Sequence, residues 1–519
     1  MMKTGTEPQH IGWQILNGCL FPFRKLAEGV SHVLGLNDSL NIIRQREDFF
    51  FNELASRSIQ GGKGYAATYL GLPYLHAFNF FVFTGDKFIK EAACYGEYTE
   101  VNPKTFDPKA RSPFDPIKEF LGDPAIVNMN GPEVAKERKG IKNYLSTNRA
   151  EAAAWEVTDK LLRNWSNDKS LNHTICLLCT QVIAQGWFNL KDVPEALVPL
   201  LKTAEHNVFN RDKVSNADFE KNRAQIKAIS DEVLTTQHAN VGEEESYIGF
   251  LKVHRKKERV TDLNALAGLV VEGNITTVLT GAVLQLAANQ NLQERLRQEL
   301  MTLDPKQMRT AEGYPGIKNL PLLHQVYLES LRFFSPSPPM ARYASKAGTI
   351  NGVHIPARSY LFIPLRQIMH DPNEWVNPSA FDPSRHLGSN RHLNQYPLAP
   401  FSLGPRMCPA SFGFAEAMFK VALVQLFREN QLSLTSHDSV EQIPVAIKEP
   451  RLKQAYFGNL RRAALEDEPH KVIQFSNTPP LDPYHALTLP STLVVSAGET
   501  FAIDQAKTSL THRTLSNSK

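Results

Sequence analysis

The stretch "FSLGPRMCPA", residues 401–410, places a single cysteine, Cys408, in a loop punctuated by glycine and proline. Gly404 allows a sharp turn and a close approach of the backbone to a flat ligand. Phe401 can shield the sulfur from water, and Arg406 adds positive charge that favours a thiolate. An α-helix is predicted directly after the loop, and its N-terminus would stabilise the thiolate further. The residues alone leave two interpretations, a metal-ligating thiolate and a buried loop cysteine.

Composition bounds the class of protein. The 519 residues are 42% hydrophobic and 21% charged, which is typical of a globular protein with a large core. The formal net charge of +4 is small for this length, so no nucleic-acid partner is predicted. Five cysteines are sparse and odd in number, which argues against a disulfide framework. We therefore predict an intracellular, cytoplasmic protein.

The order of patterns predicts a mainly α protein with small β-sheets. Aromatic and β-branched runs followed by a helical pattern occupy residues 69–92, and residues 150–303 are overwhelmingly helical in pattern. A hairpin pair of short strands is predicted within residues 348–365. Residues 370–387 form a proline-rich meander with hardly any periodicity, and a strongly apolar helix is predicted within residues 412–430. A long irregular segment in a compact domain is usually functional.

Two apolar segments bear on membrane association. Residues 11–23 are too short to span a bilayer and lack a cleavage site, so they predict at most a peripheral surface anchor. Residues 265–288 are long enough to span, but they contain Glu272, Asn274 and Gln285, which are costly in lipid. A buried helix crossing a large domain is the better interpretation.

The loop "FSLGPRMCPA" resembles the haem-binding loop of cytochrome P450 enzymes, F-x-x-G-x-R-x-C-x-G. It matches at Phe401, Gly404, Arg406 and Cys408 and departs at Ala410. The resemblance covers roughly residues 69–430. It implies a single-domain cytochrome P450 fold, haem b as cofactor, and Cys408 as the thiolate ligand of the iron.

Further motifs occur in the order that the family shows. "YLESLRFF" supplies Glu329 and Arg332, one helical turn apart, and "FDPSRHL" supplies Arg385. The resemblance implies that these three form a structural ion network that clamps the meander. It also implies that Arg342 in "PPMARYA" contacts a haem propionate, and that Arg138 in "VAKERKG" matches the arginine of the family's W-x-x-x-R helix, with valine replacing the tryptophan.

The central helix matches the family only in part. Its "EGNITT" aligns with the pattern (A/G)-G-x-(D/E)-T-(T/S), so Gly273 and Thr276 stand where dioxygen and a water would be received. Ile275 replaces the acid that, with the threonine, relays protons for O–O cleavage. Asn274 or Glu272 could support a water chain instead. The plain alternative for Thr276 is a helix threonine bonded to its own backbone.

Several activities stay open from the sequence. The resemblance implies a monooxygenase that inserts one oxygen atom into an apolar substrate of lipid, fatty acid or terpenoid type, with electrons from a ferredoxin or flavoprotein reductase. Alternatives are a peroxide-using peroxygenase, a hydroperoxide-rearranging enzyme, and a non-enzymatic haem-binding protein. Lys136, Lys139 and Lys142 predict either a docking face for an acidic electron donor or a solvated helix face.

Domain boundaries follow from the extent of these patterns. We predict an N-terminal arm over residues 1–40, a haem domain over residues 41–465, and a C-terminal extension over residues 466–519 whose last ten or so residues are disordered. The protein is expected to be a monomer.

Overall fold

The structure is a computed structural model. The predicted arm and the whole of the predicted extension lie outside the residues that it describes. The described residues are 53–72, 75–94, 119–120, 132–164, 171–191, 193–209, 214–238, 247, 272–304, 315–335, 340–344, 346–388, 391–434, 439–442, 450–453 and 457–462.

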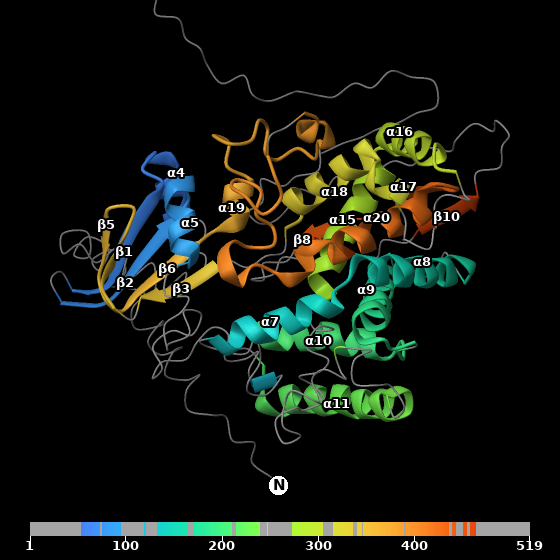
Figure 1. The fold of residues 1–519 in the computed structure, drawn as a ribbon, viewed down its shortest axis with the longest axis horizontal. Helices are drawn as coiled ribbons and strands as arrows, with labels where there is room; N and C mark the ends of the chain where they lie inside the picture. Colours follow the sequence, from blue (N-terminus) through green and yellow to red (C-terminus); the bar gives the residue numbers. More distant parts are fainter. Residues whose placement is uncertain are drawn as a thin grey trace, which may run out of the picture.

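A four-stranded sheet forms one end of the molecule (Figure 1). Its order is β1-β2-β6-β3, with β1 antiparallel to β2, β2 parallel to β6 and β6 antiparallel to β3. All five residues of β3 and of β6 are buried, as expected for strands covered on both faces. The strands are β1 (Tyr65–Leu72), β2 (Leu75–Phe83), β3 (Met340–Ala344) and β6 (Ser359–Ile363).

Three two-stranded sheets complete the described β-structure. The predicted hairpin is confirmed as β4 (Gly348–Ile350) paired with β5 (Val353–Ile355). The next strand, β6, leaves the hairpin and joins the larger sheet, because its residues bury both faces between β2 and β3. The other pairs are β7 (Asn430–Leu434) with β10 (Phe457–Arg462), and β8 (Ser439–Gln442) with β9 (Pro450–Lys453).

Helices fill the rest of the molecule (Figure 1). The core helix α20 (Phe414–Phe427) is apolar all round and buried along nearly its whole length. It packs against α8 (Thr147–Arg163), which in turn packs against α9 (Leu171–Phe188). The remaining helices are α4 (Ala55–Gln60), α5 (Asp86–Cys94), α7 (Pro132–Tyr144), α10 (Leu197–Phe209), α11 (Asn216–His238), α15 (Glu272–Ala288), α16 (Gln290–Met301), α17 (Pro315–Lys318), α18 (Pro321–Phe333) and α19 (Leu365–Met369).

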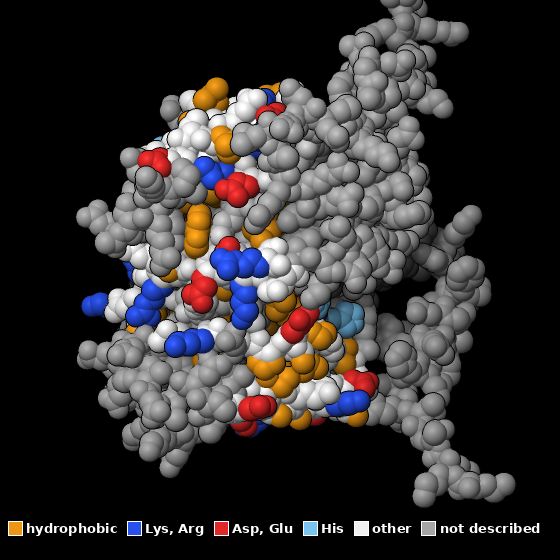
Figure 2. Space-filling view, turned by 90° about the vertical axis from the view of Figure 1, so that its right-hand side faces the viewer, with side chains coloured by type: hydrophobic (Ala, Val, Ile, Leu, Met, Phe, Trp, Pro, Cys, Tyr) orange, Lys and Arg blue, Asp and Glu red, His pale blue; other side chains and the backbone are white. Residues whose placement is uncertain are grey.

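The central helix α15 is buried, as its sequence predicts. It contacts α9, α18 and α20, and its residues from Thr276 to Ala287 are all buried. Among the described residues, no helix is both long enough and apolar enough to cross a bilayer. On the face seen in Figure 2, acidic and basic side chains are interspersed with hydrophobic ones, in agreement with the small net charge of +4. Cys176 and Cys179 are fully buried in α9, as expected for core cysteines.

The crossing of α15 and α18 depends on Gly281. A β-carbon built at Gly281 would lie 2.5 Å from ring atoms of Phe334, the residue that ends α18. The ring of Phe334 is itself held at 4.9 Å from the Phe333 ring and 6.0 Å from the Phe381 ring, centroid to centroid. The aromatic side chain therefore occupies the space that any larger residue at position 281 would need.

Gly281→Ala is expected to destabilise the protein by about 1–3 kcal/mol, because a methyl group forced into a packed core displaces its neighbours. Chemical denaturation of the purified protein measures the loss. The matched test is the double variant Gly281→Ala with Phe334→Leu, in which the smaller side chain should recover part of the stability that each single change removes. Strictly additive losses would contradict the contact.

Candidate functional site

Backbone hydrogen bonds close the loop that carries Cys408. Its amide donates to the Phe401 carbonyl at 2.9 Å, and the Met407 amide donates to the Gly404 carbonyl at 3.0 Å. Gly404 has φ +73°, and a β-carbon there would lie 3.3 Å from the carbonyl oxygen of Ala93 in α5. Glycine is needed at this position for both the conformation and the close approach. The Cys408 side chain is half-buried, and the Phe401 side chain packs against the core.

The helix predicted within residues 412–430 is confirmed as α20 (Phe414–Phe427), but its N-terminus does not follow Cys408 directly. Cys408 caps a short 3-10 turn, η5 (Pro409–Phe412), and Gly413 follows with φ +115°. The helix α20 begins only at Phe414. The left-handed conformation of Gly413 breaks the backbone between the two elements, and the Thr147 hydroxyl lies against Gly413 where a β-carbon would stand. The Ser411 amide and hydroxyl donate to the Cys408 carbonyl at 3.2 and 2.7 Å.

Arginines from separate elements meet around this loop. Arg138 of α7 donates to the Met407 carbonyl, next to Cys408. Arg342 of β3 is 1% exposed, and its guanidinium donates to the Ala93 carbonyl at 2.9 and 3.1 Å. Arg406, in the 3-10 turn η4 (Gly404–Arg406), is also buried. The structure thus brings together the predicted residues Arg138, Arg406 and Cys408, and α5 connects Arg342 to the same loop through Ala93.

This donor set fits haem b. Among the described residues, no group of three or more His, Cys, Asp or Glu side chains is placed to hold a metal ion. The half-buried Cys408 offers one thiol as a ligand. One protein ligand is sufficient for an iron whose other ligands come from a porphyrin. Guanidinium groups pair well with the carboxylates that such a macrocycle carries. Cys408 would hold the iron, and Arg138, Arg342 and Arg406 would hold the acidic side groups.

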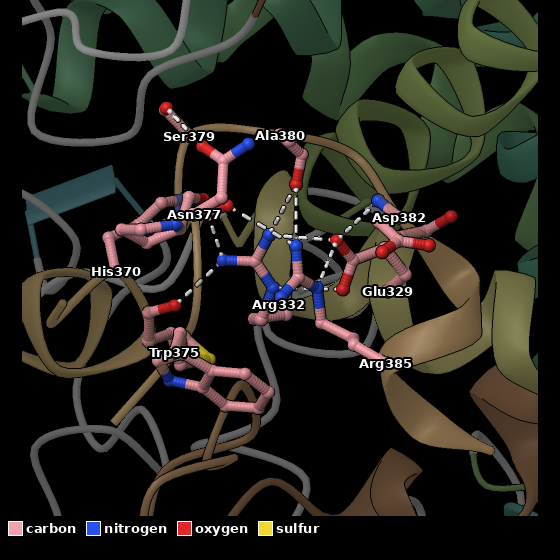
Figure 3. A network of polar contacts seen from close by, with 12 residues as sticks. Glu329, Arg332, His370, Trp375, Asn377, Ser379, Ala380, Asp382 and Arg385 are labelled. Atoms are coloured by element: carbon pink, nitrogen blue, oxygen red, sulfur yellow. Dashed lines mark hydrogen bonds and ion pairs between the residues drawn. The ribbon is translucent and has the colours of Figure 1, made fainter. Parts of the chain in front are cut away.

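The predicted ion network is present and completely assembled (Figure 3). The Glu329 carboxylate accepts two hydrogen bonds from Arg332, both at 2.8 Å, and one from Arg385 at 3.0 Å. The backbone amide of Asp382 donates to the same carboxylate at 2.9 Å. Both Glu329 and Arg332 are 0% exposed. The carboxylate is therefore fully bonded, as a buried charge must be.

The two arginines extend this network to the meander. Arg332 donates to the carbonyls of Met369, Pro378 and Ala380 at 2.9 to 3.1 Å. Arg385 donates to the Val376 carbonyl at 2.7 Å and shares the Ala380 carbonyl with Arg332. Figure 3 shows both guanidinium groups lying between Glu329 and these backbone oxygens. The meander has no α-helix or strand, only the 3-10 turn η3 (Pro383–His386) at its end, and it is held in place by donors from α18 and from η3.

His386 is a fourth member that the sequence prediction missed. Its Nε2 lies 3.0 Å from Glu329 Oε2, and its side chain is 1% exposed. The signal was present in "FDPSRHL", where the histidine follows Arg385 directly. The Trp375 ring was missed as well; it lies 5.3 Å from the Arg332 guanidinium carbon and covers the network on one side.

The bonds to Glu329 set its charge. Burial, the largest single influence, would raise the pKa of this carboxyl, but the hydrogen bonds from Arg332, His386 and the Asp382 amide together with the charge of Arg332 hold the pKa at about 2, below its usual 4.5. The group is therefore ionised in the folded protein at every pH above about 2. A lowering of this size corresponds to roughly 3 kcal/mol of stability.

The predicted residues of the central helix lie in the first turns of α15. Thr276 is 1% exposed, and Asn274 is half-buried with its Oδ1 atom fully buried. Ile275, in the position of the expected acid, packs against the hydrophobic core. Gly273 is helical, and its surroundings lie outside the described part of the chain.

Glu329→Gln is expected to cost about 3–5 kcal/mol, because it leaves two buried guanidinium groups without their counter-charge. The folded pKa of Glu329 is lowered, so its contribution is complete above about pH 4.5 and is lost as the pH falls toward about 2. The stability difference between wild type and variant should therefore shrink over this range in denaturation series at several pH values. Glu294→Gln, which breaks a largely exposed pair with Arg297, is the control and should cost less than about 1 kcal/mol. A difference that stays constant from pH 6 to pH 3 would contradict the assignment.

Comparison with known proteins finds a likeness to one family over part of the chain. Residues 216–453 match the family model described as Cytochrome P450. The flavonoid-6-hydroxylase of Mentha piperita is 29% identical over 189 residues, which are 35% of this chain and 36% of that protein. Cytochrome P450 3A5 of Homo sapiens is 26% identical over 245 residues, 45% of this chain and 46% of that protein. The chain thus matches less than half of the length of these relatives.

Solved structures extend the likeness to most of the fold. The retinoic acid bound cyanobacterial CYP120A1 has a TM-score of 0.63 at 20% identity and covers 80% of this chain and 96% of its own. The cytochrome P450DA heme domain has a TM-score of 0.61 at 17% identity and covers 78% of this chain and 92% of its own. The fold is that of a single-domain cytochrome P450, as the sequence predicts. With the cysteine loop and the ion network in place, residues 216–453 of the chain are similar to the cytochrome P450 family, and proteins of that family bind haem b.

Proposed function

We propose that this protein is a haem-thiolate monooxygenase that inserts one atom of dioxygen into an apolar small molecule. One C–H bond of the substrate becomes C–OH, while the second oxygen atom leaves as water with two electrons and two protons. The observation that carries the proposal is the closed loop in which the Cys408 amide donates to the Phe401 carbonyl at 2.9 Å beside Arg138. Bound haem supplies the iron at which dioxygen is reduced.

The residues of the chain have separate tasks in this scheme. Cys408 would ligate the iron through its thiolate, and the backbone hydrogen bonds of the loop hold the residue in place for this. Arg138, Arg342 and Arg406 neutralise and orient the carboxylates of the cofactor. Thr276, 1% exposed on α15, holds a water at the oxygen-binding position. The Glu329 network keeps the meander in position and takes no part in the chemistry.

Electrons come from a separate protein, a ferredoxin or a flavoprotein reductase. The helix α7 carries Arg138 at the loop and exposes Lys139 and Lys142 to solvent. Lysines on the element that contacts the cysteine loop suit an acidic donor, since opposite charges speed the encounter. The sparse, odd number of cysteines supports a cytoplasmic location.

The substrate is an apolar compound of lipid, fatty acid or terpenoid type. The mixed aromatic composition of the segments at 102–120 and 205–220 supports this class. The chain is similar to a flavonoid-6-hydroxylase and to a protein with bound retinoic acid. The compounds in these two names are also largely apolar.

A peroxide-driven form of the same chemistry is the second candidate. It is favoured by Ile275, whose side chain packs in the core and has no ionisable proton to donate. Hydrogen peroxide already holds two electrons and two protons more than dioxygen, so the relay from an acid is not needed.

Cys408→Ser is expected to abolish the thiolate-type Soret band of the carbon monoxide complex of the reduced protein, because a hydroxyl is not a thiolate donor to the iron. Cys179→Ala, which changes a fully buried cysteine of α9, should leave that band in place. Absorption spectra of the two haem-loaded variants and the wild type measure this. A wild-type spectrum without a thiolate-type band would remove the proposed ligand and with it the proposed function.

The two candidate oxidants are distinguished by supplying each of them separately to the purified protein. With a ferredoxin or flavoprotein reductase and dioxygen, the wild type is expected to convert a compound that gives a type I spectral shift, and fatty acids and terpenoids form the first screening set. Turnover with peroxide alone should be much slower. If peroxide alone matches the reductase system, the second candidate replaces the first.

A further inference from the structure

The helix α15 carries an unusual set of buried polar atoms. Asn274 Oδ1, Thr277 Oγ1 and Thr280 Oγ1 are all buried, and none has a hydrogen-bond partner among the described residues. Thr277 is 2% exposed and Thr280 is 1% exposed. A helix threonine commonly donates to the carbonyl one turn before it, and neither hydroxyl does so. An unsatisfied buried polar group costs about 1–3 kcal/mol, so three of them on one helix require an explanation.

Helical geometry puts these atoms on one side of Thr276. At about 100° per residue, Thr280, Thr277 and Asn274 lie about 40°, 100° and 160° around the axis from Thr276, all in the same direction. Ile275 lies about 100° from Thr276 on the opposite side. The polar arc that starts at Thr276 thus runs away from the position where the family has its acid.

Spacing along the helix suits bound water. Neighbours three residues apart on a helix lie about 5–6 Å apart, twice the length of a hydrogen bond, so one water molecule can bridge each pair. Gly281 lies within the same arc, and the Phe334 ring packed on it fills the space there and closes that end. A site with several polar partners is where buried water is found, whereas apolar voids stay dry.

We propose that ordered waters bridge Asn274, Thr277 and Thr280 and deliver protons to Thr276, in place of the acid that Ile275 has replaced. This inference rests on the proposed function, because it supplies the two protons that are consumed when the second oxygen atom of dioxygen leaves as water. Amide and hydroxyl groups do not titrate near neutral pH. They therefore hold and orient the waters, and each proton passes from water to water to the Thr276 hydroxyl without being stored on the chain.

Thr277→Val is the decisive variant, because valine keeps the shape of threonine and removes the hydroxyl. We expect the waters beside residue 277 to disappear from a crystal structure of the haem-loaded protein. We also expect the share of electrons that end in product to fall about tenfold, with the rest released as peroxide; this is less than the roughly 10²–10⁴-fold contribution of a proton-transfer group, because Thr277 only positions water. Thr277→Ser, which keeps the hydroxyl, should restore both the waters and the product yield.

Stability supplies a readout that is independent of turnover. Thr158 of α8 is also a fully buried threonine whose hydroxyl has no partner among the described residues, and it lies on another helix. If the Thr277 hydroxyl is bonded to water, Thr277→Val lowers the midpoint of thermal unfolding, because these bonds are lost. We expect the control Thr158→Val, which removes an equally buried hydroxyl far along the chain from Thr276, to raise the midpoint or leave it unchanged and to leave the product yield unchanged.

Three outcomes overturn the relay. They are a dry arc in the wild-type crystal structure, a rise in the unfolding midpoint of Thr277→Val equal to that of Thr158→Val, and an unchanged product yield in Thr277→Val. The carbon monoxide spectrum of the wild type separates this failure from the failure of the proposed function. A thiolate-type band with an unchanged yield in Thr277→Val rejects the relay alone, whereas loss of the band rejects the function on which the relay rests.

Discussion

The buried carboxylate of Glu329 is the interaction on which the arrangement of the site depends. It lies at 0% exposure and takes hydrogen bonds from Arg332, Arg385, His386 and the Asp382 amide. A charge in that position would be costly on its own, and its partners would be equally costly without it. Because Arg332 and Arg385 also bind carbonyls of the meander, the same charge holds the segment that leads to the cysteine loop. Sequence far from the thiol therefore fixes its surroundings.

A second junction, the carbonyl of Ala93, connects the sheet with the loop. Arg342 of β3 donates to it twice, and Gly404 packs against the same atom. The helix α5, which ends here, also contacts β2, β3 and β6. A displacement of the sheet would thus be transmitted to the turn before Cys408. The ion network and this junction hold the loop from two sides.

The sequence was sufficient to predict those parts of the structure in which residues of a given type have one physical role and occur at a fixed spacing. The order of Glu329, Arg332, Arg385 and Cys408 predicted the network and the loop, and the apolar pattern around Thr276 predicted a buried helix. The helix within residues 412–430 was predicted, but the 3-10 turn between Cys408 and α20 was not, because nothing in "CPASFGF" tells a helix from a 3-10 turn that is followed by Gly413 with φ +115°. His386 was missed because a histidine one residue beyond a motif has no signature until the fold brings it within 3.0 Å of Glu329.

The parallel pairing of β2 with β6 has a consequence for how the chain folds. Asn79 lies beside Ser359 and Val82 beside Phe362, so strands separated by residues 84–358 share backbone hydrogen bonds. Pairings of such long range require a large loop to close before they gain any contact energy, and they form slowly. The hairpin of β1 and β2 can form as soon as both strands are synthesised, but the second edge of β2 stays unpaired until β6 has been synthesised. The cysteine loop follows β6 in the chain, so the junction at Ala93, where Arg342 and Gly404 meet, can form only after all strands of the sheet are available.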